Sequence, residues 1–270
     1  MSDVTSIRTE NTEPGDGPPR LTRLTFHGPL SEERATRIVR RLAGAAPRTV
    51  PDLGCGWGEL MLRVLTAVPE ARGTGVDLDA RDLARGRRGA EARGLAERVV
   101  FVEESAVGTA RGPADLVLCV GASHALAPEI SEALRALRGL VADGGRVLLG
   151  EGFWQRPPTA AELARMWPEA SADDHLDLAT LVDLAVAAGF RPMGVPPVER
   201  SRGWGRVETA NADEWEEFEA GYQADVEVWL AGHGDHPLAA ETRERLDRHR
   251  AHWMGYRGVL GLAYLTLIPA

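Results

Sequence analysis

The segment from Val50 to Glu59 constrains this chain more than any other part of its sequence. It reads Val-Pro-Asp-Leu-Gly-Cys-Gly-Trp-Gly-Glu, and an apolar series with helical spacing follows over residues 60–65. This pattern predicts a strand that turns sharply into a helix, because glycine adopts positive φ without strain and lets a ligand approach the backbone. Asp77 follows Gly58 by 19 residues, where a carboxylate can accept hydrogen bonds from a ribose. The pairing predicts a nucleotide-type ligand site.

The spacing of the glycines separates two cofactor classes. Dinucleotide-binding enzymes carry G-x-G-x-x-G after the first strand, since the pyrophosphate binds at the helix N-terminus. Here the spacing is G-x-G-x-G, and Asp52 stands just before it. This carboxylate would repel a pyrophosphate but suits a ligand that carries an ammonium group. An NAD(P)-dependent oxidoreductase is therefore an alternative that the motif disfavours.

With this motif the chain resembles the class I S-adenosylmethionine-dependent methyltransferases of the small-molecule type, whose D-x-G-x-G-x-G loop holds the amino-acid end of the cofactor. The loop is found here over residues 52–58. Residues 101–106 resemble the third-strand motif that borders the adenine, 115–121 the fourth strand, and 143–149 the turn into the fifth. Roughly residues 35–200 follow the order of the family, and the end of the chain fits its closing antiparallel strand.

The resemblance implies S-adenosyl-L-methionine as cofactor and a set of residues that hold it. These residues are Asp52, Gly54, Cys55, Gly56, Gly58, Asp77, Leu78, Ser105, Ala106 and Gly121. Two positions depart from the family pattern. Pro51 lies in a central strand, where its missing N–H removes a ladder hydrogen bond, so a local bulge is expected. Ser105 takes the place of the usual aspartate at the adenine, so a hydroxyl or a backbone N–H must bind there.

Strand-like and helix-like segments alternate along the chain. Strands are expected near Val50 and Gly75, from Val99, Leu116 and Val147, and over 191–198 and 259–268. Helices are expected after the N-cap Ser31, from Glu59, Ala80 and Pro128, and over 179–188. The alternation predicts an α/β fold, a doubly wound, Rossmann-like sheet of seven mostly parallel strands with an antiparallel last strand. Ligands of such sheets bind at the carboxyl ends of the strands.

A helical lid is expected as an insertion over about 203–257, before the last strand. Helices are predicted over 213–230 and from Pro237, and the first carries an aromatic stripe on one face. The stripe can pack as core, or it can wall the substrate cavity where the lid covers the strand ends. The expected pocket residues are Trp154, Trp204, Tyr222, Trp229, Trp253 and Tyr256. Residues 21–270 then form one methyltransferase domain, and residues 1–20 are expected to be a disordered tail.

The expected reaction is methyl transfer to a nitrogen or oxygen nucleophile of a small-molecule acceptor. A hydroxyl acceptor needs a base that takes its proton. His124 is the first candidate for this base and Glu151 the second. The alternative is that both residues have structural roles. Residues 121–125 match the G-x-S-x-G elbow of hydrolases at all but one of its defined positions. This elbow requires a helix directly after it, whereas Pro128 indicates that the next helix begins after a loop. An S-adenosylmethionine-binding protein without transferase activity is the main alternative function, and Ser105 is the feature that favours it.

Composition excludes several other classes of protein. The formal net charge is −9, so no nucleic-acid partner is expected, because phosphate binding rests on clustered positive charge. All 31 basic residues are arginine, which excludes a P-loop lysine and a pyridoxal Schiff base. The two cysteines, Cys55 and Cys119, have no metal-ligand spacing. No apolar run approaches the roughly 20 residues of a membrane span. We therefore expect a cytoplasmic protein without membrane or metal partners, and leave the oligomeric state open.

Overall fold

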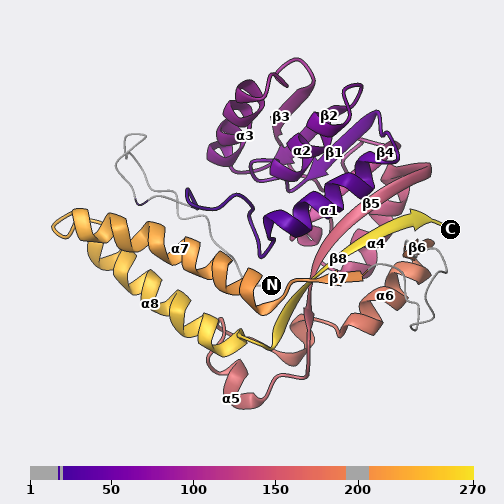
Figure 1. Ribbon diagram of the computed structural model, residues 1–270. Helices are drawn as coiled ribbons and strands as arrows, with labels where there is room; N and C mark the ends of the chain where they lie inside the picture. Colours follow the sequence, from indigo (N-terminus) through magenta and orange to yellow (C-terminus); the bar gives the residue numbers. More distant parts are fainter. Residues whose placement is uncertain (1–17, 19–20, 193–206) are drawn as a thin grey trace.

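A computed structural model describes residue 18 and residues 21–192 and 207–270 of the chain. It shows one twisted sheet with helices on both faces and a pair of long helices that projects from one end (Figure 1). Except for residue 18, the tail predicted over residues 1–20 lies outside the described residues, as does the predicted pocket residue Trp204. No helix in the described part of the chain is long and apolar enough to cross a membrane.

Among the described residues, eight strands form the sheet in the order β3-β2-β1-β4-β5-β8-β6, with β7 paired to β8. The strands are β1 (Thr49–Leu53), β2 (Arg72–Asp77), β3 (Val99–Glu103), β4 (Ala114–Val120), β5 (Val141–Trp154), β6 (Phe190–Pro192), β7 (Val207–Thr209) and β8 (Leu260–Pro269). The strands β1 to β5 run parallel to one another, whereas β8 is antiparallel to β5, β6 and β7. The predicted doubly wound fold is confirmed. The predicted seven strands did not include the short β7.

Helices cover both faces of the sheet. They are α1 (Glu32–Ala43), α2 (Glu59–Ala67), α3 (Ala80–Ala92), α4 (Ile130–Leu140), α5 (Ala160–Leu163), α6 (Leu178–Ala187), α7 (Ala212–Gly232) and α8 (Ala239–Tyr256), with the 3-10 turns η1 (Ser123–Ala125) and η2 (Ala172–Asp174). The predicted N-cap of α1 is confirmed, because the hydroxyl of Ser31 accepts a hydrogen bond from the N–H of Arg34. This cap fixes the start of α1 directly after the N-terminal segment.

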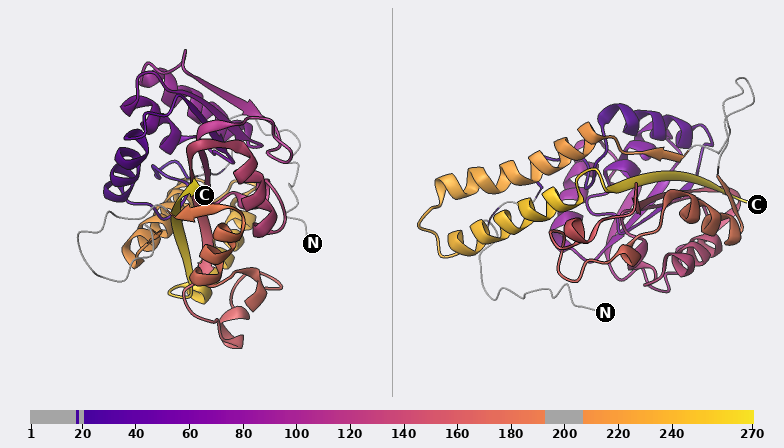
Figure 2. Two further views of the ribbon diagram at one scale, coloured as in Figure 1. Left: turned by 90° about the vertical axis from the view of Figure 1, so that its right-hand side faces the viewer. Right: turned by 90° about the horizontal axis from the view of Figure 1, so that it is seen from below.

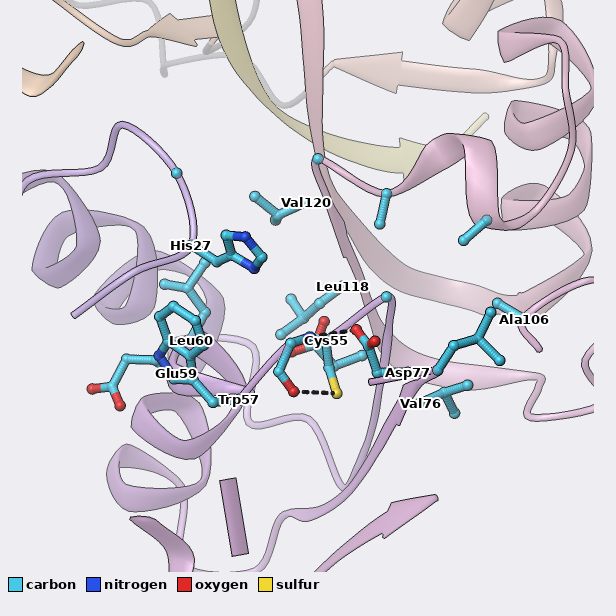
Figure 3. A pocket seen from close by; sticks show the side chains of 18 of the residues that line it. His27, Cys55, Trp57, Glu59, Leu60, Val76, Asp77, Ala106, Leu118 and Val120 are labelled. Carbon is cyan, nitrogen blue, oxygen red and sulfur yellow. Dashed lines mark hydrogen bonds between the residues drawn. The ribbon is translucent and has the colours of Figure 1, made fainter. Parts of the chain in front are cut away.

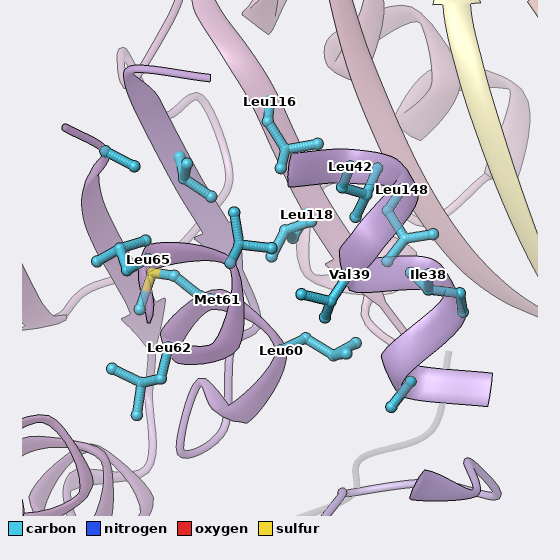
Figure 4. Close-up of a cluster of buried hydrophobic side chains, with 14 of the residues drawn as sticks. Ile38, Val39, Leu42, Leu60, Met61, Leu62, Leu65, Leu116, Leu118 and Leu148 are labelled. Atoms are coloured by element: carbon cyan, nitrogen blue, oxygen red, sulfur yellow. The ribbon is translucent and has the colours of Figure 1, made fainter. Parts of the chain in front are cut away.

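Adjacent residues of the central strands point to opposite faces of the sheet and build two cores. Leu118 belongs to the core on one face, with Ile38 of α1 and Met61 of α2 (Figure 4). Its neighbour Val117 belongs to the core on the other face, with Leu134 of α4. All five side chains are fully buried, and burial of one such aliphatic side chain contributes about 1.5–3 kcal/mol. The two cores fix β1 and β4, whose carboxyl ends carry the candidate site.

Pro51 does not displace the strand that contains it. Residues 49–53 of β1 pair with residues 72–76 of β2 without any shift of register, so the predicted bulge is absent from this pairing. On the other edge of β1, the register with β4 is limited to one pair, Asp52 with Leu118. A missing N–H shortens a ladder without moving its strand.

The predicted helical insertion is a hairpin of α7 and α8 between β7 and β8, and it extends beyond the sheet (Figure 2). α7 begins at the N-cap Asn211, which forms a capping box with Glu214. α8 begins at Ala239, two residues after the predicted start at Pro237. The base of the hairpin is tied to α1, because the guanidinium of Arg34 donates to the Glu214 carboxylate over 2.8 and 2.9 Å.

Candidate functional site

β1 turns into α2 through three glycines in the left-handed region. Gly54, Gly56 and Gly58 have φ angles of 67°, 52° and 66°, as the sequence pattern predicts. A Cβ on Gly54 would lie 2.3 Å from the Cβ of Ala122, which is well inside the contact distance of two carbons. The loop therefore requires glycine both for its conformation and for its close approach to the segment after β4.

Asp77, the last residue of β2, holds this loop from the neighbouring strand. Its Oδ2 accepts a hydrogen bond from the N–H of Gly56 over 2.7 Å, and its Oδ1 accepts one from the N–H of Asp79 over 2.9 Å. The carbonyl of Val76 accepts two more hydrogen bonds, from the first two N–H groups of the loop. Asp77 therefore has a structural role beside the ligand-binding role that its spacing predicts.

Asp52 lies near the end of β1 with only 6% of its surface exposed, and it lines the cavity beside the loop. Burial, together with the negative charge of Asp77, raises the pKa of Asp52 to about 7. Within the described residues, its carboxylate has no cationic partner. Because a buried carboxylate without a cation is unfavourable, a ligand with an ammonium group would be stabilised here.

A cavity of about 530 Å³ opens at the carboxyl ends of β1, β2 and β4 (Figure 3). The predicted cofactor residues Asp52, Gly54, Cys55, Gly56, Asp77, Leu78, Ser105, Ala106 and Gly121 line this cavity. Gly58 does not line it; a Cβ there would lie 2.9 Å from the ring of Phe101. Two apolar lining residues, Leu78 and Val107, expose 70% and 66% of their surface. Exposed apolar side chains at a cavity rim favour a ligand with an apolar face.

Comparisons with known proteins agree with this geometry. Residues 52–147 match the family model of a methyltransferase domain. The uncharacterized protein YjhP of Escherichia coli (strain K12) is 30% identical over 245 residues, which are 90% of this chain and 93% of YjhP. A methyltransferase from Geobacter sulfurreducens, solved in complex with S-adenosyl-L-homocysteine, is 26% identical with a TM-score of 0.78, covering 93% of this chain and 98% of its own. A methyltransferase from Thiobacillus denitrificans, solved with the same ligand, is 26% identical with a TM-score of 0.77 over 93% and 99% of the two chains.

The chain belongs to the class I S-adenosylmethionine-dependent methyltransferases. In this methyltransferase the rim of the cavity departs from the family pattern at Ser105. The hydroxyl of Ser105 accepts a hydrogen bond from the N–H of Val107 over 3.2 Å. It keeps its own O–H as a donor, whereas an aspartate would offer acceptors only. Beside it, Glu104 pairs with Arg111 over 2.7 Å.

The two predicted catalytic residues lie differently. His124 lines the cavity from η1, shortly after β4. Glu151 lies in β5 and is not part of the lining. Burial raises the pKa of Glu151, and hydrogen bonds from the Ser123 hydroxyl and the Gly152 N–H oppose that shift. Its Oε2 is buried without a hydrogen-bond partner among the described residues. Glu151 thus contacts the turn that carries His124, and not the cavity itself.

The described aromatic residues predicted for the acceptor pocket do not line the cavity. They contact other rings instead, in the pairs Trp154–Trp167, Tyr222–His249, Trp229–His233, Trp253–Trp215 and Tyr256–Trp167. Two long helices that leave the sheet have little other apolar surface to cover, so their rings pack on each other and on the segment after β5. Tyr222 also packs against the cluster that contains Trp57 of the cofactor loop, although it does not line the cavity.

One wall of the cavity comes from residues 21–31, here called the N-terminal strap, for which the sequence predicts no element before the N-cap Ser31. The indole N–H of Trp57 donates to the carbonyl of Thr25 over 2.8 Å, and the hydroxyl of Tyr264 donates to the carbonyl of Pro29 over 3.1 Å. Both side chains line the cavity as well. The strap has no helical or strand periodicity, so nothing in its own sequence indicates where it lies.

Proposed function

We propose that this methyltransferase transfers the methyl group of S-adenosylmethionine to a nitrogen or oxygen atom of a small-molecule acceptor. The observation that carries the proposal is Asp52, a buried carboxylate that lines the cavity and has a pKa raised to about 7. The ammonium group of the cofactor fits this carboxylate by charge. Gly54 and Gly56, in the left-handed region, leave the backbone open to a ligand. The residues present therefore fit the cofactor.

The rest of the cavity offers partners for the other parts of the cofactor. We assign Asp77 to the ribose hydroxyls, since its carboxylate lines the cavity at the end of β2. The exposed apolar side chains of Leu78 and Val107 suit the faces of the adenine ring. Ser105 has an O–H donor for the edge of the adenine. Ala106 and Gly121 complete the set by leaving room beside these groups.

When bound, the cofactor supplies a sulfonium methyl group that a nucleophile displaces in line. The residues of the chain then have to align the acceptor and exclude water. We assign His124 to take the proton of a hydroxyl acceptor, because its imidazole lines the cavity. Glu151, the second candidate, does not line the cavity, and its proximity to Ser123 suits it to hold η1 in position. A neutral amine acceptor requires desolvation and no base.

The charges around the cavity bear on the class of acceptor. Its lining contains the carboxylates of Asp52, Glu59, Asp77 and Glu104 and, within the described residues, no arginine. Glu59 pairs with Arg63 and Arg93, and Glu104 pairs with Arg111, so Asp52 and Asp77 are the lining carboxylates without an ion pair among the described residues. An anionic acceptor would meet like charge beside them, so a neutral or cationic small molecule is favoured. We propose that the hairpin of α7 and α8, which is joined to the strap by the hydrogen bond from Thr22 to Asp225, acts as a lid over this acceptor. A cytoplasmic location suits two free cysteines.

The test is calorimetric titration of the purified protein with S-adenosylhomocysteine and, separately, with NAD. The proposal expects binding of the first ligand alone. A methylation assay with panels of amines, phenols and carboxylic acids then follows, guided by any ligand that co-purifies and is identified by mass spectrometry. Binding without transfer to any acceptor would favour the alternative, an S-adenosylmethionine-binding protein, for which the Ser105 substitution is the supporting observation. Binding of NAD alone would overturn the cofactor assignment.

A further inference from the structure

The N-terminal strap brings a histidine to the glycine loop. His27 lines the cavity, and its ring stacks on Trp57 with the ring centroids 5.2 Å apart and an interplanar angle of 10°. Its Nδ1 lies 3.3 Å from the position that a Cβ on Gly56 would take. Figure 3 shows the imidazole between Trp57 and Val120, pointing into the cavity. His27 therefore lies against the part of the site that is assigned to the amino-acid end of the cofactor.

That end of the cofactor carries a carboxylate as well as an ammonium group, and a carboxylate requires hydrogen-bond donors. The chain has no lysine, and no arginine lines the described cavity. The imidazoles of His27 and His124 are the lining side chains that can carry a positive charge.

We propose that His27 is a cofactor-binding residue whose imidazole donates a hydrogen bond to the carboxylate of S-adenosylmethionine, while Asp52 accepts from the ammonium group. The inference rests on the proposed function. His27 is favoured over His124 for this role because it lies against Gly56 and stacks on the next residue of the loop. The stacked indole also restricts the orientation of the imidazole.

α7 holds the strap in place from outside the cavity. Asp225, which has 3% of its surface exposed, accepts hydrogen bonds from the hydroxyl of Thr22 over 2.7 Å and from the N–H of Arg23 over 3.2 Å. Asp225 does not line the cavity. It acts as a positioning residue for His27, so the hairpin and the cofactor loop are joined through the strap.

The experiment compares two probes by calorimetric titration: S-adenosylhomocysteine, and 5′-deoxy-5′-methylthioadenosine, which lacks the amino-acid end. For His27→Ala we expect a Kd for S-adenosylhomocysteine raised about tenfold, as for loss of a hydrogen bond to a charged group, and a Kd for the shorter probe within about twofold. His27→Gln, which keeps a donor, should recover part of the loss. His252→Ala, on α8 and outside the lining, is the control and should bind both probes normally.

Unchanged affinity of His27→Ala for S-adenosylhomocysteine would overturn the inference. An equal loss of affinity for both probes would also overturn it, because His27 would then shape the cavity without binding the amino-acid end of the cofactor. If the wild-type protein binds neither probe, the proposed function itself is overturned. Asp225→Ala should raise the Kd for S-adenosylhomocysteine in the wild-type background but add nothing in the His27→Ala background. If the losses of affinity from Asp225→Ala and His27→Ala are additive, Asp225 does not act by positioning His27. Thermal unfolding of each variant verifies that it is folded.

Discussion

The carboxylate of Asp77 and the N–H of Gly56 are joined by a hydrogen bond of 2.7 Å between the ends of two neighbouring strands. The same carboxylate lines the cavity. The second acidic residue of the motif therefore orders the glycine loop and faces the ligand at the same time. A loop that is held before the ligand binds loses less conformational entropy on binding.

Replacement of Asp77 should weaken cofactor binding through both roles. We expect Asp77→Ala to reduce the binding free energy of S-adenosylhomocysteine by about 1.5–3 kcal/mol, the cost of losing a charged hydrogen-bond partner. Asp77→Asn keeps one oxygen that can accept from Gly56, so its loss should be smaller. Calorimetric titration of both folded variants measures the difference, and wild-type affinity in Asp77→Ala would contradict the cofactor site.

Asp52 should make the stability of the ligand-free protein depend on pH. Its pKa is raised from 3.8 to about 7 in the folded protein, so the folded state binds a proton that the unfolded state releases. Protonation of Asp52 therefore stabilises the folded state fully below about pH 4, and this stabilisation is lost as the pH rises through 7. We expect Asp52→Asn, which cannot ionise, to be more stable than wild type at pH 8 by on the order of 2–4 kcal/mol. Thermal unfolding at pH 8 and pH 4 measures this, and the two proteins should differ less at pH 4.

The same carboxylate should give cofactor binding the opposite dependence on pH. Below its pKa of about 7, a proton must leave Asp52 before an ammonium group can pair with it. We therefore expect the Kd of S-adenosylhomocysteine to rise about tenfold for each unit that the pH falls below 7 in the wild-type protein. Asp52→Asn should bind weakly with a flat profile. A flat wild-type profile would show that Asp52 is not the partner of the ammonium group.

His124 is expected to affect turnover and not cofactor affinity. If the acceptor is a hydroxyl, we expect His124→Ala to lower turnover by about 10²–10⁴, the usual contribution of a general base. The Kd of S-adenosylhomocysteine should stay within a few-fold, because the residue is assigned to the acceptor. Steady-state kinetics with the acceptor found in the screen tests the rate. A near-normal rate would show that His124 is not the base, and a large loss of affinity would make His124 a cofactor-binding residue.

The hairpin of α7 and α8 is expected to close when the cofactor binds. Its first helix, α7, is joined to the cavity wall through the strap, since Glu214 accepts a hydrogen bond from Ser31 over 2.6 Å and Asp225 accepts one from Thr22 over 2.7 Å. Hydrogen exchange with and without S-adenosylhomocysteine measures the effect. We expect slower exchange at amides of 213–230 and 238–256 when the ligand is present. Identical exchange in both states would make the hairpin a static part of the fold.

Several features of the site could be predicted from the sequence because they are local. The positive φ angles of Gly54 and Gly56 follow from glycine at a strand-to-helix turn. Asp52 and Asp77 follow from the spacing of a strand, a helix and the next strand, which brings both residues to the same edge of a parallel sheet. The N-cap Ser31 is likewise encoded within a few residues.

Other features were decided only by the tertiary structure. The strap reaches the cavity because Tyr264 donates to the carbonyl of Pro29, a residue 235 positions earlier in the chain, and no periodicity encodes a contact of that range. Trp229 belongs to the aromatic stripe predicted over 213–230, yet its ring stacks on His233 with the ring centroids 4.9 Å apart. The spacing of apolar residues along a helix determines which of its faces is apolar. Which other element packs against that face depends on the packing of the whole chain. The loop chemistry was therefore readable from residues close together in sequence, whereas the walls around it depend on contacts that exist only after the chain has folded.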